Sequence, residues 1–353
     1  MCAMLEHEHV SIAVGERSAL PVIVAVHSTV LGHAVGGCRL WRYRDWREGL
    51  DDALRLSEAM TLKCALADLP LGGGKSVIAL APDTDLTPER RRAAMLDLGD
   101  AVDRFGGSYG VGEDVGTTAE DMLIARERTR YAYCLPESEG GSGEPSEPTA
   151  EGVRAAIGVT LERAFGTAEV SGRRIAIIGL GQVGSRVARR LAAADADLVV
   201  CDIDASKRAL AEELGAAWTD PETSLSAEVD LLVPAALGGL LTDDSVATLR
   251  CTAIAGPANN QLAHDGVADA LRDRGILWAP DFVVNAGGVI YGHAMEFEGC
   301  TREDAVARVG AVADSLQAVF SAAFEHGITP LAAARRVADE RLESARRQRA
   351  QVA

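Results

Sequence analysis

The chain lacks the features of several protein classes. Its 353 residues include 35 Lys and Arg against 52 Asp and Glu, which gives a formal net charge of −17. A chain this acidic repels phosphate backbones, so we expect no nucleic-acid partner. No apolar run approaches the roughly 20 residues that span a bilayer, and residues 1–14 lack the basic and apolar regions of a signal peptide. We therefore expect a cytoplasmic protein with no membrane partner.

Cysteine and histidine patterns are equally sparse. The count of cysteines is odd, their spacing is wide and no C-x-x-C pair occurs; they are Cys2, Cys38, Cys64, Cys134, Cys201, Cys251 and Cys300. This pattern indicates reduced, mostly buried thiols rather than a disulfide framework or a zinc site. The seven histidines show no metal-ligand spacing. We expect no metal, and the absence of a G-x-S-x-G segment argues against a serine hydrolase.

The chain divides at a polar segment. Residues 137–148 contain acids, glycines, serines and prolines but no apolar residue, which is typical of a domain boundary. Before it, short apolar strands such as 21–26 and 76–80 mix with helical patterns. After it, apolar runs at 174–178, 198–202, 231–234, 252–255 and 276–279 alternate with helices. This alternation predicts a parallel sheet with right-handed crossovers.

A glycine-rich loop follows the first of these later strands. It reads Gly179-Leu180-Gly181-Gln182-Val183-Gly184 and opens an amphipathic helix. Glycines in this pattern permit a tight turn, the close approach of a pyrophosphate and close helix–strand packing. Asp202 ends the next strand, where an acid accepts ribose hydroxyls and repels a 2′-phosphate. The sequence predicts NAD as cofactor; an unliganded glycine turn is the alternative.

The predicted fold is therefore α/β, with an N-terminal α/β domain and a Rossmann-type, doubly wound dinucleotide-binding domain. We expect the first domain at 1–136 and the second at 150–300. Residues 301–353 are predicted to be helical, and packing back onto the first domain is one arrangement open to them.

A second glycine-rich stretch, Gly72-Gly73-Gly74-Lys75-Ser76, lies in the first domain. It is not a P-loop, because the Walker pattern needs a glycine where Leu69 stands. Apolar runs on both sides predict that Lys75 is partly buried, and Lys63 stands twelve positions upstream. A buried lysine near another cation can serve as a base at neutral pH. The alternative is a solvated lysine in a turn.

Three further polar residues stand at positions suited to a site. Asp114 lies in the glycine-flanked segment 112–117 before a predicted helix, where the helix dipole alone could favour an acid. Asn260 and Asn285 follow strands of the second domain, at the sheet edge where doubly wound folds bind ligands. Both asparagines could equally be turn formers.

Several segments in register resemble the dehydrogenases that act on glutamate, leucine, phenylalanine and valine. They are Met60-Thr61-Leu62-Lys63, Leu69–Lys75, Gly112–Thr117, the glycine loop at 179–184, Ala258-Asn259-Asn260 and Pro280–Gly288. The resemblance runs from about Val24 to Gly288. It implies NAD-dependent oxidative deamination of an L-amino acid to its 2-oxo acid and ammonia, with the reverse reductive amination. It also implies a homo-oligomer.

The resemblance implies a role for each matched residue. Lys63 would bind the substrate α-carboxylate, with Gly37 in the loop that helps to hold it. Lys75 would be the catalytic base that activates water, and Asp114 would shuttle protons to and from the substrate nitrogen. Thr149 would contact the nicotinamide amide. Asn260 and Asn285 would hold cofactor or substrate.

One position of the first domain narrows the range of expected substrate side chains. Glutamate-specific members of this family carry a lysine directly before the Gly-Gly pair, where this chain has Val35. We therefore expect an apolar side chain of the leucine or valine type, with phenylalanine or another aromatic amino acid as the alternative. Glu151 and the segment Tyr291–Glu296 depart from the family's usual pattern, which leaves room for a change in specificity.

Two other functions stay open. A dinucleotide-binding sensor or scaffold would have dispensed with Lys75 and Asp114, yet both are present. A 2-hydroxy-acid dehydrogenase would need a catalytic histidine after the glycine loop, and His264 and His293 lie in no supporting pattern.

Overall fold

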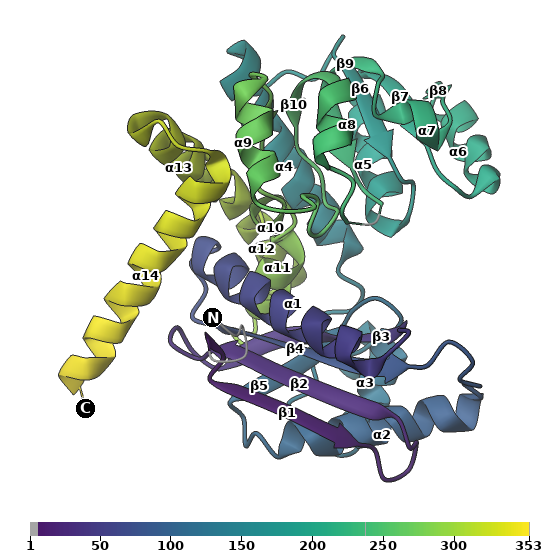
Figure 1. Ribbon diagram of the computed structural model, residues 1–353, viewed down its shortest axis with the longest axis vertical. Helices are drawn as coiled ribbons and strands as arrows, with labels where there is room; N and C mark the ends of the chain where they lie inside the picture. The colour runs from purple at the N-terminus through teal and green to yellow at the C-terminus, as the bar shows by residue number, and fades with distance from the viewer. Residues whose placement is uncertain (1–5, 237, 353) are drawn as a thin grey trace. The chain divides into compact units, whose positions relative to one another are not determined.

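The computed structural model describes residues 6–236 and 238–352, so Cys2 lies outside the described residues. The chain forms two compact units, both of which are discontinuous in sequence (Figure 1). Within the described residues, the first unit contains 6–144, 292–300 and 338–352. The second contains 145–291 and 301–337. The short segment 292–300 thus folds with the N-terminal residues, whereas the sequence predicted it in the second domain. Residues 338–352 also fold with the first unit, the arrangement that the sequence left open for 301–353, but 301–337 fold with the second.

The first unit is built on a five-stranded sheet with the order β1-β2-β4-β3-β5. Its strands are β1 (His9–Val14), β2 (Pro21–Ser28), β3 (Ala34–Arg42), β4 (Gly72–Leu80) and β5 (Tyr109–Glu113). Strands β1, β2 and β4 pair antiparallel, whereas β3 runs parallel to both β4 and β5. The sheet therefore places β3 between the two strands that lead to the polar residues predicted for the site.

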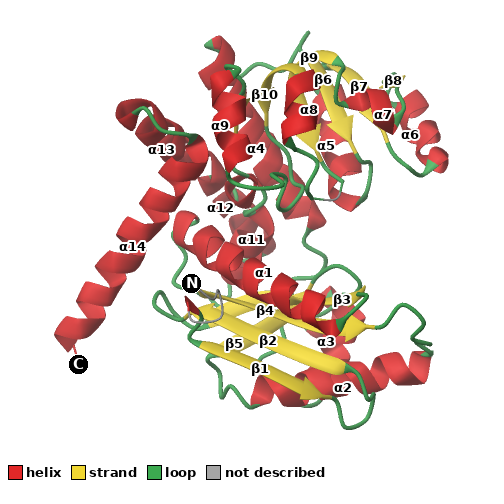
Figure 2. Cartoon of the chain, in the orientation of Figure 1, coloured by secondary structure: helices red, strands yellow, loops and turns green. Residues whose placement is uncertain are grey.

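Helices cover both faces of this sheet (Figure 2). Helices α2 (Pro88–Asp103) and α3 (Ala119–Arg126) pack on one face, where Cys38, Ile78 and Tyr109 contribute to the core. Helix α1 (Trp46–Leu66) packs on the other face, against β2 and β4 residues such as Val77. Because side chains alternate along a strand, residues two apart from Val77 on β4 face α1.

The second unit contains a six-stranded, wholly parallel sheet with the order β11-β10-β9-β6-β7-β8. Its strands are β6 (Arg174–Ile178), β7 (Asp197–Cys201), β8 (Ala217–Trp218), β9 (Glu228–Pro234), β10 (Arg250–Ile254) and β11 (Leu277–Trp278). The predicted α/β, doubly wound architecture is confirmed. Strand β8 was not predicted, whereas the equally short β11 was, as part of the apolar run 276–279.

Helices surround this second sheet and extend beyond it. They are α4 (Ser146–Phe165), α5 (Gln182–Ala193), α6 (Arg208–Glu213), α7 (Pro221–Ser224), α8 (Asp243–Thr248), α9 (Gly266–Asp273), α10 (Asp281–Val284), α11 (Gly287–Glu296), α12 (Arg302–Arg308), α13 (Ala311–His326) and α14 (Pro330–Val352), with the short 3₁₀ turn η3 (Ala205–Lys207). The 3₁₀ turn η2 (Glu137–Glu139) belongs to the first unit. None of the described helices combines the length and the apolar character that a membrane crossing requires.

The last helix belongs to both units. Residues up to Val337 of α14 fold with the second unit, and those from Ala338 onward fold with the first. In the first unit the Arg341 guanidinium donates hydrogen bonds to the carbonyl oxygens of Ala65 and Leu66, the latter at 2.9 Å. A cation at this position satisfies carbonyls that have no partner within the helix and complements the helix dipole. Helix α14 thereby caps the C-terminus of α1.

Glycines allow an unusually close approach of β3 and β4. A Cβ atom at Gly36 would lie 1.8 Å from the carbonyl oxygen of Gly74, and one at Gly74 would lie 2.6 Å from the Tyr109 ring. The Tyr109 hydroxyl donates to the Gly36 carbonyl at 2.9 Å, so the ring cannot move away without the loss of that bond. The strand that carries Lys75 is therefore held by the backbone of β3 and by the Tyr109 ring.

We predict that Gly36→Ala lowers the free energy of unfolding by about 1–3 kcal/mol or more, because the added methyl group meets backbone rather than a side chain that can turn away. Urea unfolding of the purified protein measures this change. The matched control is Gly158→Ala on α4, where the new Cβ meets only Ala168 at 3.8 Å. That substitution should leave stability unchanged or raise it by about 0.5–1 kcal/mol. Equal losses in both variants would contradict the prediction.

Candidate active site

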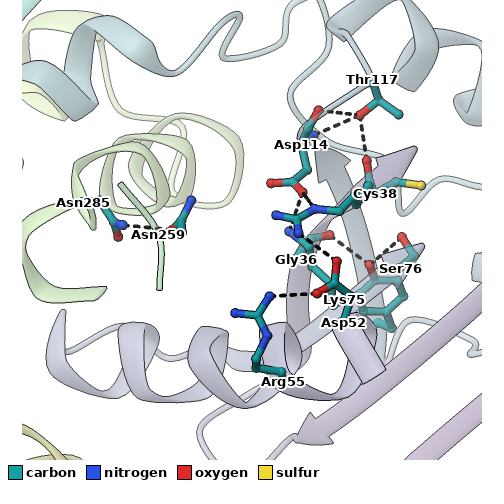
Figure 3. A network of polar contacts seen from close by, with 12 residues as sticks. Gly36, Cys38, Asp52, Arg55, Lys75, Ser76, Asp114, Thr117, Asn259 and Asn285 are labelled. Atoms are coloured by element: carbon teal, nitrogen blue, oxygen red, sulfur yellow. Dashed lines mark hydrogen bonds and ion pairs between the residues drawn. The ribbon is translucent and has the colours of Figure 1, made fainter. Parts of the chain in front are cut away.

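The first unit brings Lys75 and Asp114 into direct contact (Figure 3). Lys75 lies on β4 and Asp114 directly follows β5. The Lys75 Nζ atom is 3.0 Å from Oδ2 of Asp114, and the two side chains are 6% and 18% exposed. Lys75 is two residues from Val77, so both face α1. The prediction that Lys75 is buried is confirmed, and its partner is the predicted carboxylate.

A tight turn holds the Asp114 backbone. The Asp114 N–H donates to the Thr117 hydroxyl oxygen at 2.9 Å, and that hydroxyl donates to the Cys38 carbonyl at 2.8 Å. Gly116 closes the turn with φ +85°, and a Cβ there would lie 2.0 Å from the Leu40 carbonyl oxygen. Only glycine fits both the left-handed conformation and the space. The turn therefore fixes the carboxylate relative to β3.

The Asp114 carboxylate is stabilised in its ionised form. Burial acts to raise the pKa of Asp114, but attraction to Lys75 and Arg39 outweighs burial, and the net pKa is lowered. By contrast, burial raises the pKa of the neighbouring Cys38 thiol to about 12. Cys38 is therefore an inert core thiol, whereas Asp114 carries a charge at neutral pH.

Glycines also remove side chains from the face of the sheet around Lys75. A Cβ at Gly37 would lie 2.3 Å from the Glu113 carbonyl oxygen and 2.7 Å from the Asp114 Cβ. A Cβ at Gly73 would lie 2.1 Å from the Thr61 nitrogen, so α1 rests directly on β4. Lys63 lies in the last turn of α1, two residues beyond Thr61, and is half-buried. The predicted substrate residues Gly37 and Lys63 thus belong to the same unit as Lys75.

The predicted cofactor loop occupies the turn between β6 and α5 in the second unit. Gly179 has φ +102°, and a Cβ at Gly184 would lie 2.1 Å from the Gly179 carbonyl oxygen. Gly181 is the N-cap of α5, and a Cβ there would meet no protein atom within 4 Å. This open space beside a helix N-terminus suits a pyrophosphate. The cofactor loop therefore fits a dinucleotide.

Asp202 lies beside this loop but is already engaged by backbone. Its Oδ2 accepts a hydrogen bond from the Leu180 N–H at 2.6 Å, and its Oδ1 accepts one from the Asp204 N–H at 2.8 Å. Each carboxylate oxygen has a further lone pair, so both can still accept from ribose hydroxyls. Asp202 therefore fixes the glycine loop, and its contact with the ribose hydroxyls stays a prediction.

Two asparagines of the second unit, Asn259 and Asn285, form a hydrogen-bonded pair, of which the sequence predicted only Asn285 for the site. Asn285 Nδ2 donates to Asn259 Oδ1 at 2.9 Å, as Figure 3 shows, and to the Pro257 carbonyl at 3.2 Å. The Asn285 Oδ1 atom is buried and has no hydrogen-bond partner, so it is suited to accept one from a ligand. Asn260, predicted in place of Asn259, adopts φ +51° in the adjoining turn.

Thr149 lies in the first turn of α4. Its hydroxyl donates to the Pro145 carbonyl at 2.7 Å, and a Cβ at Gly288 would lie 2.9 Å from its oxygen. The hydroxyl proton is therefore used within the helix. What Thr149 can offer a ligand is the remaining acceptor capacity of its oxygen.

The two departures from the family's pattern have structural partners. Glu151 on α4 forms ion pairs with Arg154 and Arg190. Glu296 accepts hydrogen bonds from the Cys134 N–H at 2.8 Å and the Ser142 N–H at 3.0 Å, and thereby ties α11 to the end of the N-terminal segment. Both residues hold the fold. Among the described residues, no group of three or more His, Cys, Asp or Glu could hold a metal ion.

Sequence reasoning missed Arg39. Its guanidinium Nε donates to Asp114 Oδ2 at 3.2 Å, from the same face of β3 as Gly37. The signal was the period of two along a predicted strand, which puts residues 37 and 39 on one face. Because a strand from residue 34 was not predicted, that signal was not available.

Comparisons with known proteins match both parts of the chain to one family. Residues 6–131 match the family model for the Glu/Leu/Phe/Val dehydrogenase dimerisation domain, and residues 200–350 match that for Glutamate/Leucine/Phenylalanine/Valine dehydrogenase. Residues 150–238 also match the NAD binding domain of D-isomer specific 2-hydroxyacid dehydrogenases, a likeness confined to the dinucleotide fold.

Similar proteins cover nearly the whole chain. A phenylalanine dehydrogenase from Lysinibacillus sphaericus is 40% identical over 96% of this chain and 89% of its own length. A leucine dehydrogenase from Bacillus subtilis (strain 168) is 39% identical over 98% and 94%. The crystal structure of L-tryptophan dehydrogenase from Nostoc punctiforme has a TM-score of 0.81 and 34% identity, over 97% of each chain. The chain therefore belongs to the Glu/Leu/Phe/Val dehydrogenase family and is an NAD-dependent amino acid dehydrogenase.

Proposed function

We propose that the chain catalyses the NAD-dependent oxidative deamination of an apolar L-amino acid to its 2-oxo acid and ammonia, and the reverse reductive amination. The observation that carries this proposal is the buried Lys75–Asp114 ion pair on a sheet face made largely of glycine. A lysine amine and a carboxylate at 3.0 Å place two groups side by side that can each give up or take up a proton, which is what acid–base catalysis on one substrate needs.

Four side chains have distinct parts in the proposed reaction. Lys63 binds the substrate α-carboxylate through a charge-assisted contact. NAD, when bound, accepts the hydride from the substrate α-carbon. Lys75 then removes a proton from the water that adds to this carbon, and Asp114 takes protons from, and returns them to, the substrate nitrogen. Asn285 Oδ1, buried without a partner, is proposed to accept a hydrogen bond from cofactor or substrate.

The substrate side chain is proposed to be apolar, of the leucine or valine type. Val35 is 8% exposed on β3, next to the glycines of the site. A side-chain carboxylate placed against it would lose water and gain no cation from this position, which costs several kcal/mol.

An aromatic amino acid is the second candidate, and one cluster favours it. Gly110 pairs with Val35 in the sheet, and a Cβ at Gly110 would lie 2.3 Å from the Tyr133 ring. The Tyr133 and Phe297 rings have centroids 4.6 Å apart. An aromatic wall beside Val35 would suit a substrate ring. A sensor or scaffold is disfavoured because Lys75 and Asp114 are both present and paired. The family model's dimerisation domain supports a homo-oligomer.

A substrate series tests the proposal. We expect kcat/KM with NAD for glutamate to be at least about 100-fold below that for the best of leucine, valine, phenylalanine and tryptophan, since a desolvated carboxylate costs several kcal/mol. Tyr133→Ala should lower kcat/KM for phenylalanine more than for leucine if the ring wall contacts the substrate. If glutamate is the best substrate, Val35 does not line the substrate pocket. If the protein turns over no amino acid, the proposed function is wrong.

Lys75→Ala should lower kcat by about 100-fold or more, as the loss of a general base does, while NAD binding is retained. Steady-state kinetics and calorimetric NAD titration separate the two effects. The matched control is Lys207→Ala, a lysine of η3 in the second unit, which should keep wild-type kcat. Near-native turnover by Lys75→Ala would show that another group is the base.

Asp202→Asn should narrow the preference for NAD over NADP by about tenfold, or about 1.4 kcal/mol. Asparagine can still accept the hydrogen bond from Leu180, although it loses the one from Asp204, and it no longer repels a 2′-phosphate. The ratio of kcat/KM for the two cofactors, in both proteins, is the measurement. A wild-type enzyme that prefers NADP would overturn the role of Asp202.

A further inference from the structure

A chain of charged side chains leads away from the Lys75–Asp114 pair across the sheet face, as Figure 3 shows. Arg39 contacts Asp114 Oδ2 through Nε at 3.2 Å and Asp52 Oδ2 through Nη1 at 3.0 Å. Arg39 is 16% exposed and Asp52 is 20% exposed. The Arg39 guanidinium therefore bridges two carboxylates, one on β5's turn and one on α1, and it has little contact with water.

Asp52 is itself held from two sides. The Tyr43 hydroxyl donates to Asp52 Oδ2 at 2.8 Å, and the Arg55 guanidinium contacts Asp52 Oδ1 at 2.7 Å. Asp52 therefore accepts bonds from three side chains and has a fixed direction. Because Asp52 and Asp114 hold different nitrogens of Arg39, the guanidinium has one preferred orientation.

We propose that Arg39 is a positioning residue of the active site, which, anchored by Asp52, keeps the Asp114 carboxylate ionised and directed at Lys75. Arg39 is not a catalytic residue, because it acts on the substrate only through Asp114. The proposal rests on the proposed function for its consequence in turnover, but its effect on Asp114 stands without it.

The charges around Asp114 show why Arg39 is needed. Burial favours the protonated carboxyl, and Lys75 and Arg39 are the two cations that oppose it. Titratable groups approach from each packed element: Arg39 and Cys38 from β3, Lys75 from β4, Tyr109 and Glu113 from β5, and Asp52 from α1 through Arg39. If Lys75 passes its proton on during the reaction, Arg39 is the cation that keeps its charge throughout.

These charges determine in which direction the pKa of Asp114 should shift when Arg39 is replaced. Loss of Arg39 removes a cation that lowers the pKa of Asp114, so that pKa rises. Asp114 must be ionised to accept a proton from the substrate nitrogen, and activity is lost as pH falls through its pKa. The acidic limb of the pH profile of kcat/KM should therefore move to higher pH in the variant.

Arg39→Met keeps the length of the aliphatic stem and removes the charge. We expect the acidic limb to move up by about one pH unit or more, since an opposite charge at this distance lowers a carboxyl pKa by about 1–3 units. Arg39→Lys keeps the positive charge but lacks the planar guanidinium that contacts both carboxylates. It should move the acidic limb by less than half as much as Arg39→Met. Carbon-13 NMR of aspartate-labelled protein, with the Asp114 signal assigned by Asp114→Asn, gives the Asp114 titration directly.

Two control variants separate this effect from general damage. Arg17→Gln breaks an ion pair with buried Asp97 elsewhere in the first unit, and should lower stability without moving the acidic limb. The second control combines Glu113→Gln with Arg39→Met. Glu113→Gln removes the neighbouring carboxyl, whose pKa burial raises to about 7, and the Asp114 signal should stay shifted in this double variant.

The outcomes are distinct. An Asp114 NMR titration that is unchanged in Arg39→Met overturns the inference, whatever the turnover. A shifted titration in an enzyme that turns over no amino acid supports the inference about Asp114 and refutes the proposed function instead. A shift equally large in Arg17→Gln would mean that loss of stability, rather than the Arg39 charge, moves the limb, and would also overturn the inference.

Discussion

The contact between β3 and β4 is the constraint on which the site depends. Gly36 and Gly74 approach until no Cβ could stand between them, and Tyr109 closes the contact from the other face. Next to this contact, Lys75 on β4 and Arg39 on β3 both reach Asp114, at 3.0 and 3.2 Å. Gly36 and Gly74 therefore bring the strands close, while Gly37 and Gly73, on the same face as Lys75, leave that face open around the charges.

A buried ion pair of this kind is not an efficient way to stabilise a fold. Removing both charges from water costs several kcal/mol for each ion, and attraction at short range offsets this only when the geometry is good. Here Arg39 supplies the additional bond to the Asp114 carboxylate and is itself held by Asp52, while Thr117 fixes the Asp114 backbone, so the carboxylate stays ionised inside the first unit. The cost in stability of burying these charges is consistent with a site whose charges are needed for proton transfer.

Sequence patterns were sufficient for the fold class, the glycine loop and the burial of Lys75, because each rests on local residues. The apolar runs around Gly72–Lys75 predicted that Lys75 is partly buried, although the strand expected at 76–80 begins already at Gly72, and the loop at 179–184 predicted a turn into a helix. Contacts distant in sequence were not predictable in this way. Arg39 and Asp114 are 75 positions apart, and Glu296 is 162 positions from Cys134. Nothing in either segment alone indicates its partner, and the two-residue strand β8 shows no period at all.

Lysine is nearly absent from this protein, and that absence gives the burial of Lys75 a practical consequence. Of the 35 basic residues only Lys63, Lys75 and Lys207 are lysines, and all others are arginines. Reagents that acylate or reductively alkylate primary amines therefore have few targets besides the N-terminus. Lys75 is 6% exposed and sheltered by Asp114, so modification should begin elsewhere. The enzyme thus offers an almost amine-free surface, on which a single introduced lysine would become the dominant point of attachment for a dye or a support.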